Sequence, residues 1–103
     1  MADLSQEAWA EQLKNDNNSV IIDVRTEAEL REGYIPKAIH LDIFKADEFM
    51  DGLKAMDPAK NYYVYCRSGN RSGQACAIMN QLGIENAYNL AGGFMEWTGP
   101  SQR

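Results

Sequence analysis

The chain has few of the residues that would build a metal centre, a disulfide framework or a membrane span. It contains 103 residues with only two cysteines, one histidine and three prolines. Two cysteines and one histidine do not complete a zinc site, which normally takes four ligands, so we expect no metal ion and no cofactor. No stretch approaches the ~18 consecutive apolar residues of a membrane-spanning helix. The first residues, Met1 to Glu7, also lack the basic head and apolar run of a secretory signal. We therefore expect a cytoplasmic protein with free thiols and no membrane partner.

Acidic residues are absent from one part of a chain that is acidic as a whole. The formal net charge is −5, yet no Asp or Glu lies between Asp57 and Glu85. Lys60, Arg67 and Arg71 fall inside that window. An acidic protein lacks the basic face that nucleic acid requires, so nucleic acid is not expected as a partner. A small basic segment in an acidic body suits a small anion better.

Composition and length indicate one globular domain spanning residues 1–103, with a core over about residues 5–98. Apolar residues make up 45% of the chain and charged residues 24%, as in soluble proteins. A chain of this length is enough for one hydrophobic core. Without an obvious extra apolar face, a monomer is the simplest expectation.

Strand-like and helix-like segments alternate along the chain, which predicts an α/β fold with a mostly parallel sheet. Buried strands are expected over residues 20–24 and 62–65, and a last strand is expected over residues 86–90. Residues 38–43 alternate apolar and polar side chains, which predicts a strand with Ile39, Leu41 and Ile43 facing inward.

Helices are expected between these strands. Ser5 can cap a helix that runs to about Lys14, and Thr26 with Glu29 forms a capping-box pattern before Gly33. A short helix is also expected after residues 92–93, which are both glycine.

Two further helices are predicted from apolar stripes at helical spacing. Gly83 is a natural C-terminal cap for the second of them. The first stripe comprises Ala46, Phe49, Met50 and Leu53, and the second comprises Ala75, Ile78, Met79 and Leu82.

The most reactive segment predicted by the sequence is Cys66-Arg67-Ser68-Gly69-Asn70-Arg71-Ser72. It follows a buried strand and precedes a helix, so the N-terminal amides of that helix point back toward the thiol. Helix N-termini and neighbouring arginines lower a cysteine pKa from ~8.5 to roughly 3.5–7.5. Cys66 is therefore a candidate nucleophile. The alternative of an inert buried cysteine fits poorly with five polar or glycine residues directly after it.

Two other segments are expected to meet this loop. Ligands of open α/β sheets bind beyond the carboxyl ends of the strands. Cys66 lies at such an end, and so do Asp23-Val24-Arg25 and Ala91-Gly92-Gly93. Three separate segments are therefore predicted to converge on one pocket.

Four segments together resemble the rhodanese-like sulfurtransferase domain, from about Ser5 to Trp97. They are Asp23-Val24-Arg25, Gly33-Tyr34-Ile35-Pro36-Lys37-Ala38-Ile39, the Cys66–Ser72 stretch, and Leu90-Ala91-Gly92-Gly93 with Trp97. The resemblance implies a three-layer fold with a sheet of about five strands and helices on both faces. Where the family commonly shows Gly-His-Ile-Pro-Gly-Ala, this chain has Tyr34 and Lys37, which affects local packing rather than the chemistry.

What the resemblance implies is transfer of a sulfane sulfur from a small anionic donor such as thiosulfate to a thiol, cyanide or a thioredoxin-like acceptor. Cys66 would carry the sulfur as a persulfide, and the loop residues agree with that chemistry. Backbone amides can surround the anion, Ser68 and Ser72 can donate hydroxyl protons, and Gly69 permits the turn. The expected substrate-binding residues are Arg67, Ser68, Gly69, Asn70, Arg71 and Ser72.

The arginines near the loop admit more than one role. Arg67 is best placed to meet the donor's oxygens, because a guanidinium matches an oxyanion in bidentate fashion. Arg71 is expected to pair with a carboxylate such as Asp23 and brace the loop. Asp23 is expected to support the loop without contacting the substrate. Arg25 is either a similar support or half of an exposed charge pair with Asp23.

His40 and Cys76 are not expected to take part in the chemistry. His40 is far in sequence from the loop, so a Cys–His dyad is disfavoured. Cys76 lies beside an apolar helix stripe, and the helical rise carries it too far from Cys66 for an easy disulfide.

Two other functions remain open. A cysteine-dependent phosphatase or arsenate reductase also places a thiolate and an arginine around such a loop. Its loops resemble one another in being one residue longer than the four residues between Cys66 and Arg71. The other is a persulfide carrier or regulatory binding module that receives sulfur from a protein partner.

Overall fold

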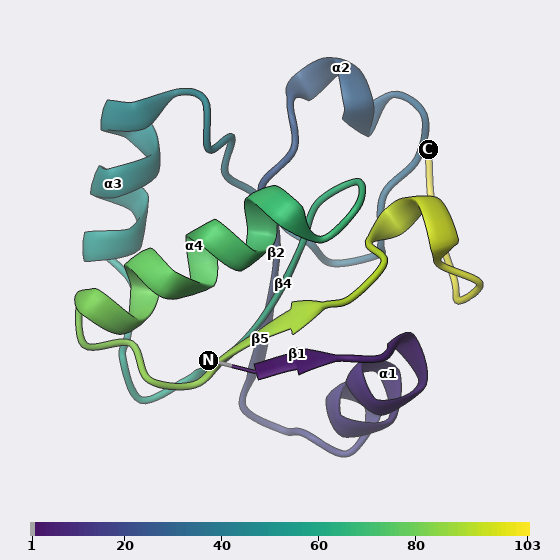
Figure 1. Cartoon of the computed structure of the whole chain (residues 1–103), viewed down its shortest axis with the longest axis horizontal. Helices are drawn as coiled ribbons and strands as arrows, with labels where there is room; N and C mark the ends of the chain where they lie inside the picture. The colour runs from purple at the N-terminus through teal and green to yellow at the C-terminus, as the bar shows by residue number, and fades with distance from the viewer. Residues whose placement is uncertain (1) are drawn as a thin grey trace.

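Five short strands form one sheet in the order β1-β5-β4-β2-β3, and every neighbouring pair is parallel. The structure is a computed structural model that describes residues 2–103 (Figure 1). The predicted α/β fold with a sheet of about five strands is confirmed. The strands are β1 (Ala2–Leu4), β2 (Ser19–Asp23), β3 (Ile39–His40), β4 (Asn61–Tyr65) and β5 (Ala87–Leu90).

The helices begin and end largely at the signals in the sequence. Ser5 Oγ accepts a hydrogen bond from the Ala8 amide at 3.2 Å and caps α1. Thr26 and Glu29 form the predicted capping box of α2. The helical elements are α1 (Gln6–Lys14), α2 (Glu27–Leu30), α3 (Ala46–Lys54), α4 (Asn70–Gln81) and the 3-10 turn η1 (Phe94–Glu96).

Helix α4 ends at a Schellman motif, which requires a left-handed residue just past the helix. Gly83 occupies that position with φ +90°, and its amide donates to the Asn80 carbonyl. The Ile84 amide donates to the Met79 carbonyl at 2.9 Å. The buried Ile84 side chain then joins the core beside α4.

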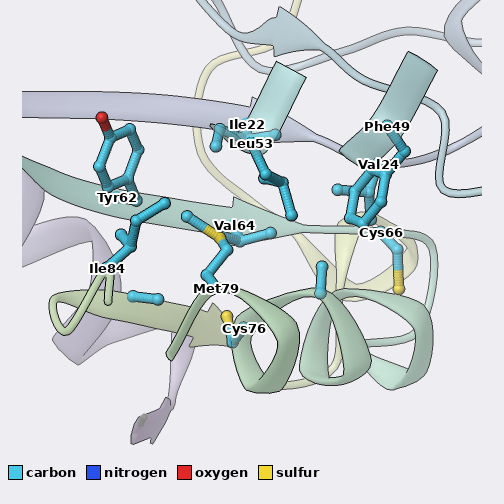
Figure 2. Packing of buried hydrophobic residues seen from close by; sticks show 12 residues of the cluster. Ile22, Val24, Phe49, Leu53, Tyr62, Val64, Cys66, Cys76, Met79 and Ile84 are labelled. Carbon is cyan, nitrogen blue, oxygen red and sulfur yellow. The ribbon is translucent and has the colours of Figure 1, made fainter. Parts of the chain in front are cut away.

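Strand β4 lies in the middle of the sheet and divides its side chains between two cores. Successive side chains of a strand point to opposite faces. Tyr63 and Tyr65 pack with Trp9 of α1 on one face. Tyr62 and Val64 face the other, which α3 and α4 cover (Figure 2). The period-two alternation therefore places Cys66, just past the strand, on the α4 side of the sheet.

The apolar core between the sheet, α3 and α4 fixes the position of Cys66. Figure 2 shows Phe49 and Leu53 of α3 and Met79 of α4 packed against β2 and β4, with the Cys66 sulfur directed toward α4. Burying each of these three side chains contributes about 1.5–3 kcal/mol to the stability of the fold. The end of β4, which carries the thiol, is thus held in place by packing against α3 and α4.

The predicted strand over residues 38–43 is wrong in its length and in one inward residue. Only Ile39 and His40 pair, and Ile39 is 50% exposed. Within residues 2–103, strand β3 lies at the sheet edge and pairs with β2 alone, and half of the Ile39 side chain is left uncovered. Leu41 and Ile43 do pack against the core, but from the irregular segment that follows the strand.

The helix stripes are correct except at their ends. Phe49 and Leu53 are buried and Met50 packs beside them, whereas Ala46 in the first turn of α3 is exposed. Leu82, just past α4, is 37% exposed. Residues at the ends of a helix extend past the layer they pack on, and so lose its cover. None of the helices within residues 2–103 is long and apolar enough to cross a membrane.

Candidate active site

The loop of residues 67–69 joins the end of β4 to the start of α4 and turns back over Cys66. Gly69 precedes α4 with φ +97°, a left-handed conformation that side chains disfavour. A methyl group at Gly69 would also lie 3.1 Å from the carbonyl oxygen of Leu90. The glycine therefore allows both the turn and the close approach of the loop to β5.

The sulfur of Cys66 is surrounded by hydrogen-bond donors. The Gly69 amide donates to Sγ at 3.1 Å, and the Ser72 hydroxyl oxygen lies 3.4 Å from Sγ. Burial by itself raises the pKa of the Cys66 thiol. The hydrogen bonds from the Ser72 hydroxyl and from the amides of Ser72, Gly69 and Ser68 outweigh burial, so the pKa falls below its ordinary value. The site is arranged to favour a thiolate.

The loop residues divide into those that face the sulfur and those that face solvent. Ser72 is fully buried, and its side chain lies beside Sγ, as does the Gly69 amide. The side chains of Arg67, Ser68 and Asn70 are exposed. Ser68 acts on the thiol through its backbone amide rather than its hydroxyl.

Arg67 lines a small cavity beside the loop. Within residues 2–103 its side chain makes no ion pair and no hydrogen bond, in contrast to Arg25 and Arg71. The cavity has a volume of about 270 Å³, and it is lined by Arg25, Glu29, Glu32, Arg67, Phe94 and Met95.

Arg71 braces the loop, but its partner is Glu29 rather than the predicted Asp23. Its guanidinium donates to both carboxylate oxygens of Glu29 at 2.8 Å and lies 5.4 Å from the ring centre of Phe44. Asp23 is not free to pair with it because Arg25 already occupies that carboxylate. Glu29 was visible in the sequence only as a helix cap, and the carboxylate performs both tasks at once.

Asp23 and Arg25 form a buried pair, so the interpretation as an exposed charge pair is wrong. Their exposed fractions are 0% and 2%. Arg25 Nη2 donates to Asp23 Oδ2 at 2.8 Å and to the Gly33 carbonyl at 2.7 Å. The guanidinium also stacks 4.5 Å from the ring centre of Phe94. A buried charge is tolerated only when paired and hydrogen-bonded, as it is here.

The segment after β5 packs directly against the loop, as the sequence predicted. The Phe94 amide donates to the Cys66 carbonyl at 2.8 Å, and the Met95 amide donates to the Arg67 carbonyl at 3.0 Å. Gly93 lies against the backbone of Arg67 and Ser68. The segments that follow β4 and β5 therefore meet beside the thiol, and just past the end of β2 the Val24 amide donates to the Tyr65 carbonyl at 3.1 Å.

His40 and Cys76 have structural roles, as expected. His40 Nε2 donates to the carbonyl oxygen of Arg25 at 2.6 Å and not to the thiol. Cys76 is free and fully buried among the apolar residues under α4. Burial raises the pKa of the Cys76 thiol to about 12, so it stays protonated at neutral pH.

We expect the Glu29→Gln variant to be less stable than wild type at neutral pH, by about 1 kcal/mol or roughly 4–8 °C in Tm. The hydrogen bonds with Arg71 outweigh burial and lower the pKa of Glu29 from 4.5 to about 2. A lowered pKa gives stabilisation that is present above 4.5 and lost as the pH falls toward 2. Thermal unfolding of both proteins from neutral pH down to about pH 2 measures the difference in Tm between them.

The gap between Glu29→Gln and wild type should close as the pH approaches 2. The exposed Glu27 lies in the same helical turn, and Glu27→Gln is the matched control. Its effect on Tm should be small at every pH. An equal gap for Glu29→Gln at neutral and at acid pH would contradict the role of the ion pair.

Comparison with known proteins shows what the chain is similar to. The rhodanese-like domain model matches residues 6–100. A sulfurtransferase from Allochromatium vinosum is 33% identical over 92% of this chain and 86% of its own length. The thiosulfate sulfurtransferase GlpE of Coxiella burnetii is 35% identical over 88% of this chain and 80% of its own length. The crystal structure of a rhodanese-related protein from Thermoplasma volcanium superposes with a TM-score of 0.84 at 28% identity, covering 99% of this chain and 98% of its own.

Proposed function

Since this chain belongs to the rhodanese-like domain family, we propose that it transfers a sulfane sulfur from a small anionic donor such as thiosulfate to a thiophilic acceptor, through a persulfide on Cys66. Relatives at about 33% identity are named sulfurtransferases. The acceptor is a thiol, cyanide or a thioredoxin-like protein.

The proposed reaction has two steps with the same sulfur chemistry. The Cys66 thiolate attacks the outer sulfur of thiosulfate, the donor's S–S bond breaks, and sulfite leaves with the bonding electron pair. The product is Cys66–S–S⁻. The acceptor thiolate or cyanide then attacks the outer sulfur, and the Cys66 thiolate is released. No redox cofactor is consumed in either step.

The observation that carries this proposal is the set of donors around Cys66 Sγ. The Gly69 amide and the Ser72 hydroxyl group lie within 3.1 and 3.4 Å of the sulfur, and together with neighbouring amides they lower its pKa. Hydrogen bonds to a charged acceptor contribute about 1.5–3 kcal/mol each. They stabilise the attacking thiolate, and after transfer the loop amides stabilise the persulfide anion.

The donor has to displace part of the loop to reach this sulfur, because Cys66 is fully buried. Arg67 and Ser68, the two residues that follow it, are exposed. A shift of these two residues opens the short loop around Cys66 enough to admit a single sulfur atom. The longer loops of cysteine-dependent phosphatases make a wider cradle, which suits a tetrahedral oxyanion instead.

Intact-protein mass measurement after incubation with thiosulfate tests the function. We expect a gain of one sulfur, about 32 Da, located on the peptide that contains Cys66. Cyanide should remove it with release of thiocyanate. The Cys76→Ala variant should behave in the same way, because Cys76 lies in the core. No mass gain would favour a carrier loaded by a protein partner, and phosphate release from phenyl phosphate without thiocyanate would favour a phosphatase.

We expect Arg67→Ala to raise the KM for thiosulfate about tenfold with a smaller change in kcat. Arg67 makes no ion pair within residues 2–103 and lines the cavity beside the loop, so its guanidinium is available for the donor's sulfonate oxygens. Steady-state thiocyanate formation measures both constants. Arg31→Ala, an exposed arginine outside this cavity, is the control, and equal KM values for the two variants would contradict the assignment.

A further inference from the structure

A polar side chain in the middle of β5 connects the sheet to the loop. Asn89 is only 4% exposed and contacts three separate segments. Its Nδ2 donates to Asp3 Oδ1 of β1 at 2.8 Å and to the Gly69 carbonyl at 3.0 Å. Its Oδ1 lies 2.5 Å from the Ser72 hydroxyl oxygen. A buried amide with every polar atom satisfied is a rigid element.

The partners determine the orientation of the Asn89 amide. A carboxylate and a carbonyl oxygen only accept hydrogen bonds, so Nδ2 must be the atom that faces Asp3 and Gly69. Oδ1 then faces Ser72 and can only accept. A hydrogen bond across this contact therefore has the Ser72 hydroxyl group as its donor.

Ser72 has one proton and two acceptors for it. A serine hydroxyl group donates one hydrogen bond. The same oxygen lies 2.5 Å from Asn89 Oδ1 and 3.4 Å from Cys66 Sγ. When the proton bonds to Asn89, it does not reach the sulfur. Asn89 thus competes with Cys66 for the only side-chain donor beside the sulfur within residues 2–103.

We propose that Asn89 is a positioning residue for the sulfur-transfer reaction, and that it decides whether the Ser72 hydroxyl proton is donated to its own amide or to Cys66. This inference rests on the proposed role of Cys66 as the sulfur carrier. Asn89 does not touch the reacting atoms and acts only through Ser72 and Gly69.

The two forms of the cysteine place different demands on the Ser72 proton. A thiolate carries its charge on Sγ, next to Ser72. A persulfide carries it on the outer sulfur, about one S–S bond or 2 Å further away. In the persulfide form, Asn89 Oδ1 accepts the hydrogen bond from Ser72. The Ser72 hydroxyl group therefore has an acceptor throughout the reaction cycle.

The charged groups around this network are few. Asp3 of β1 bonds to Asn89, and Arg71 of α4 acts on Cys66 through its charge. Across the sheet, Asp23 of β2 is neutralised by Arg25. None of these charged groups contacts the Ser72 hydroxyl group. Its two possible acceptors are therefore Asn89 Oδ1 and Cys66 Sγ.

A double-mutant cycle on the Cys66 pKa tests the proposal. The variants are Asn89→Leu, Ser72→Ala and the double variant, and the readout is thiolate ultraviolet absorbance against pH, with the matching Cys66→Ala protein as the blank. Loss of Asn89 loosens the loop whether residue 72 is serine or alanine. Only in the protein that keeps Ser72 does it also release the hydroxyl group to donate to Cys66. We expect the Asn89 substitution to increase the thiolate-to-thiol ratio about threefold to tenfold more in the presence of Ser72 than in the Ser72→Ala background, which has no hydroxyl group to donate.

Several outcomes would overturn the proposal. If the Asn89 substitution has the same effect in both backgrounds, or the opposite coupling, Asn89 acts only by shaping the loop. Asn89→Ala repeats the cycle without a leucine side chain that has to fit, and Asn86→Leu on the exposed residue before β5 is the control. The mass gain from thiosulfate in wild type is independent of this coupling, so failure of the proposed function is recognised separately.

Discussion

Replacing Cys66 with serine is expected to lower kcat/KM for thiocyanate formation at least about 10³-fold, because the protein loses the atom that carries the sulfur. The hydroxyl oxygen of serine can still accept the hydrogen bond that the Gly69 amide gives to Sγ, so the loop keeps its anchor. An alcohol is far less acidic than a thiol and forms no stable analogue of the persulfide. Steady-state kinetics with thiosulfate and cyanide measure the loss.

The second cysteine provides the control for this variant. Cys76→Ala removes a buried thiol from the core under α4 and should cost about 1–2 kcal/mol of stability. Its kcat should remain near that of wild type, since the Cys76 thiol is protonated at neutral pH. Retention of more than about a tenth of the activity by Cys66→Ser would show that another group carries the sulfur.

The sequence was most informative where local rules agree with packing. The capping box of Thr26 and Glu29 and the C-terminal cap at Gly83 depend only on nearby residues, and both formed as predicted. The position of Cys66 followed from a buried strand that ends before a helix. Because β4 is central, the alternation of its side chains also determines which face the thiol takes.

The sequence was least informative about which long side chains meet. Arg71 can reach several carboxylates, and only the fold shows that Arg25 has already taken Asp23 and that Glu29 is near. Strand β1 was missed because three residues are too few for a pattern, and it forms by pairing with β5.

Asn89 was missed as part of the site for a related reason. A lone polar residue within an apolar strand shows in the sequence as a weak strand signal. Its partners Asp3 and Gly69 are distant in the chain, and only the parallel pairing of β1 with β5 brings them together. A polar residue inside a predicted strand was the available signal, because such a group has to find partners wherever the strand is buried.

The other large effect is expected from Gly93→Ala, which should lower stability by about 3–5 kcal/mol and activity by about 100-fold. Gly93 has φ +64° and ψ −166°, a region essentially restricted to glycine. A methyl group there would lie 2.6 Å from the Ser68 amide nitrogen and closer still to the Arg67 carbonyl group. These clashing atoms are backbone, so the loop that surrounds Cys66 has to move. Urea unfolding and steady-state thiocyanate formation measure the two losses.

Gly83→Ala separates backbone strain from displacement of the loop. Gly83 also has a positive φ, +90°, but within residues 2–103 no atom beyond its own chain neighbours lies within 4 Å of a methyl group placed there. This variant should lose about 1–2 kcal/mol of stability, the usual cost of a left-handed alanine, and keep the activity of wild type. Equal losses for the two variants would mean that contact with the loop adds nothing. A loss of activity confined to Gly93→Ala would instead indicate that the end of β5 holds the loop around Cys66 in shape, because of these two glycines only Gly93 lies against that loop.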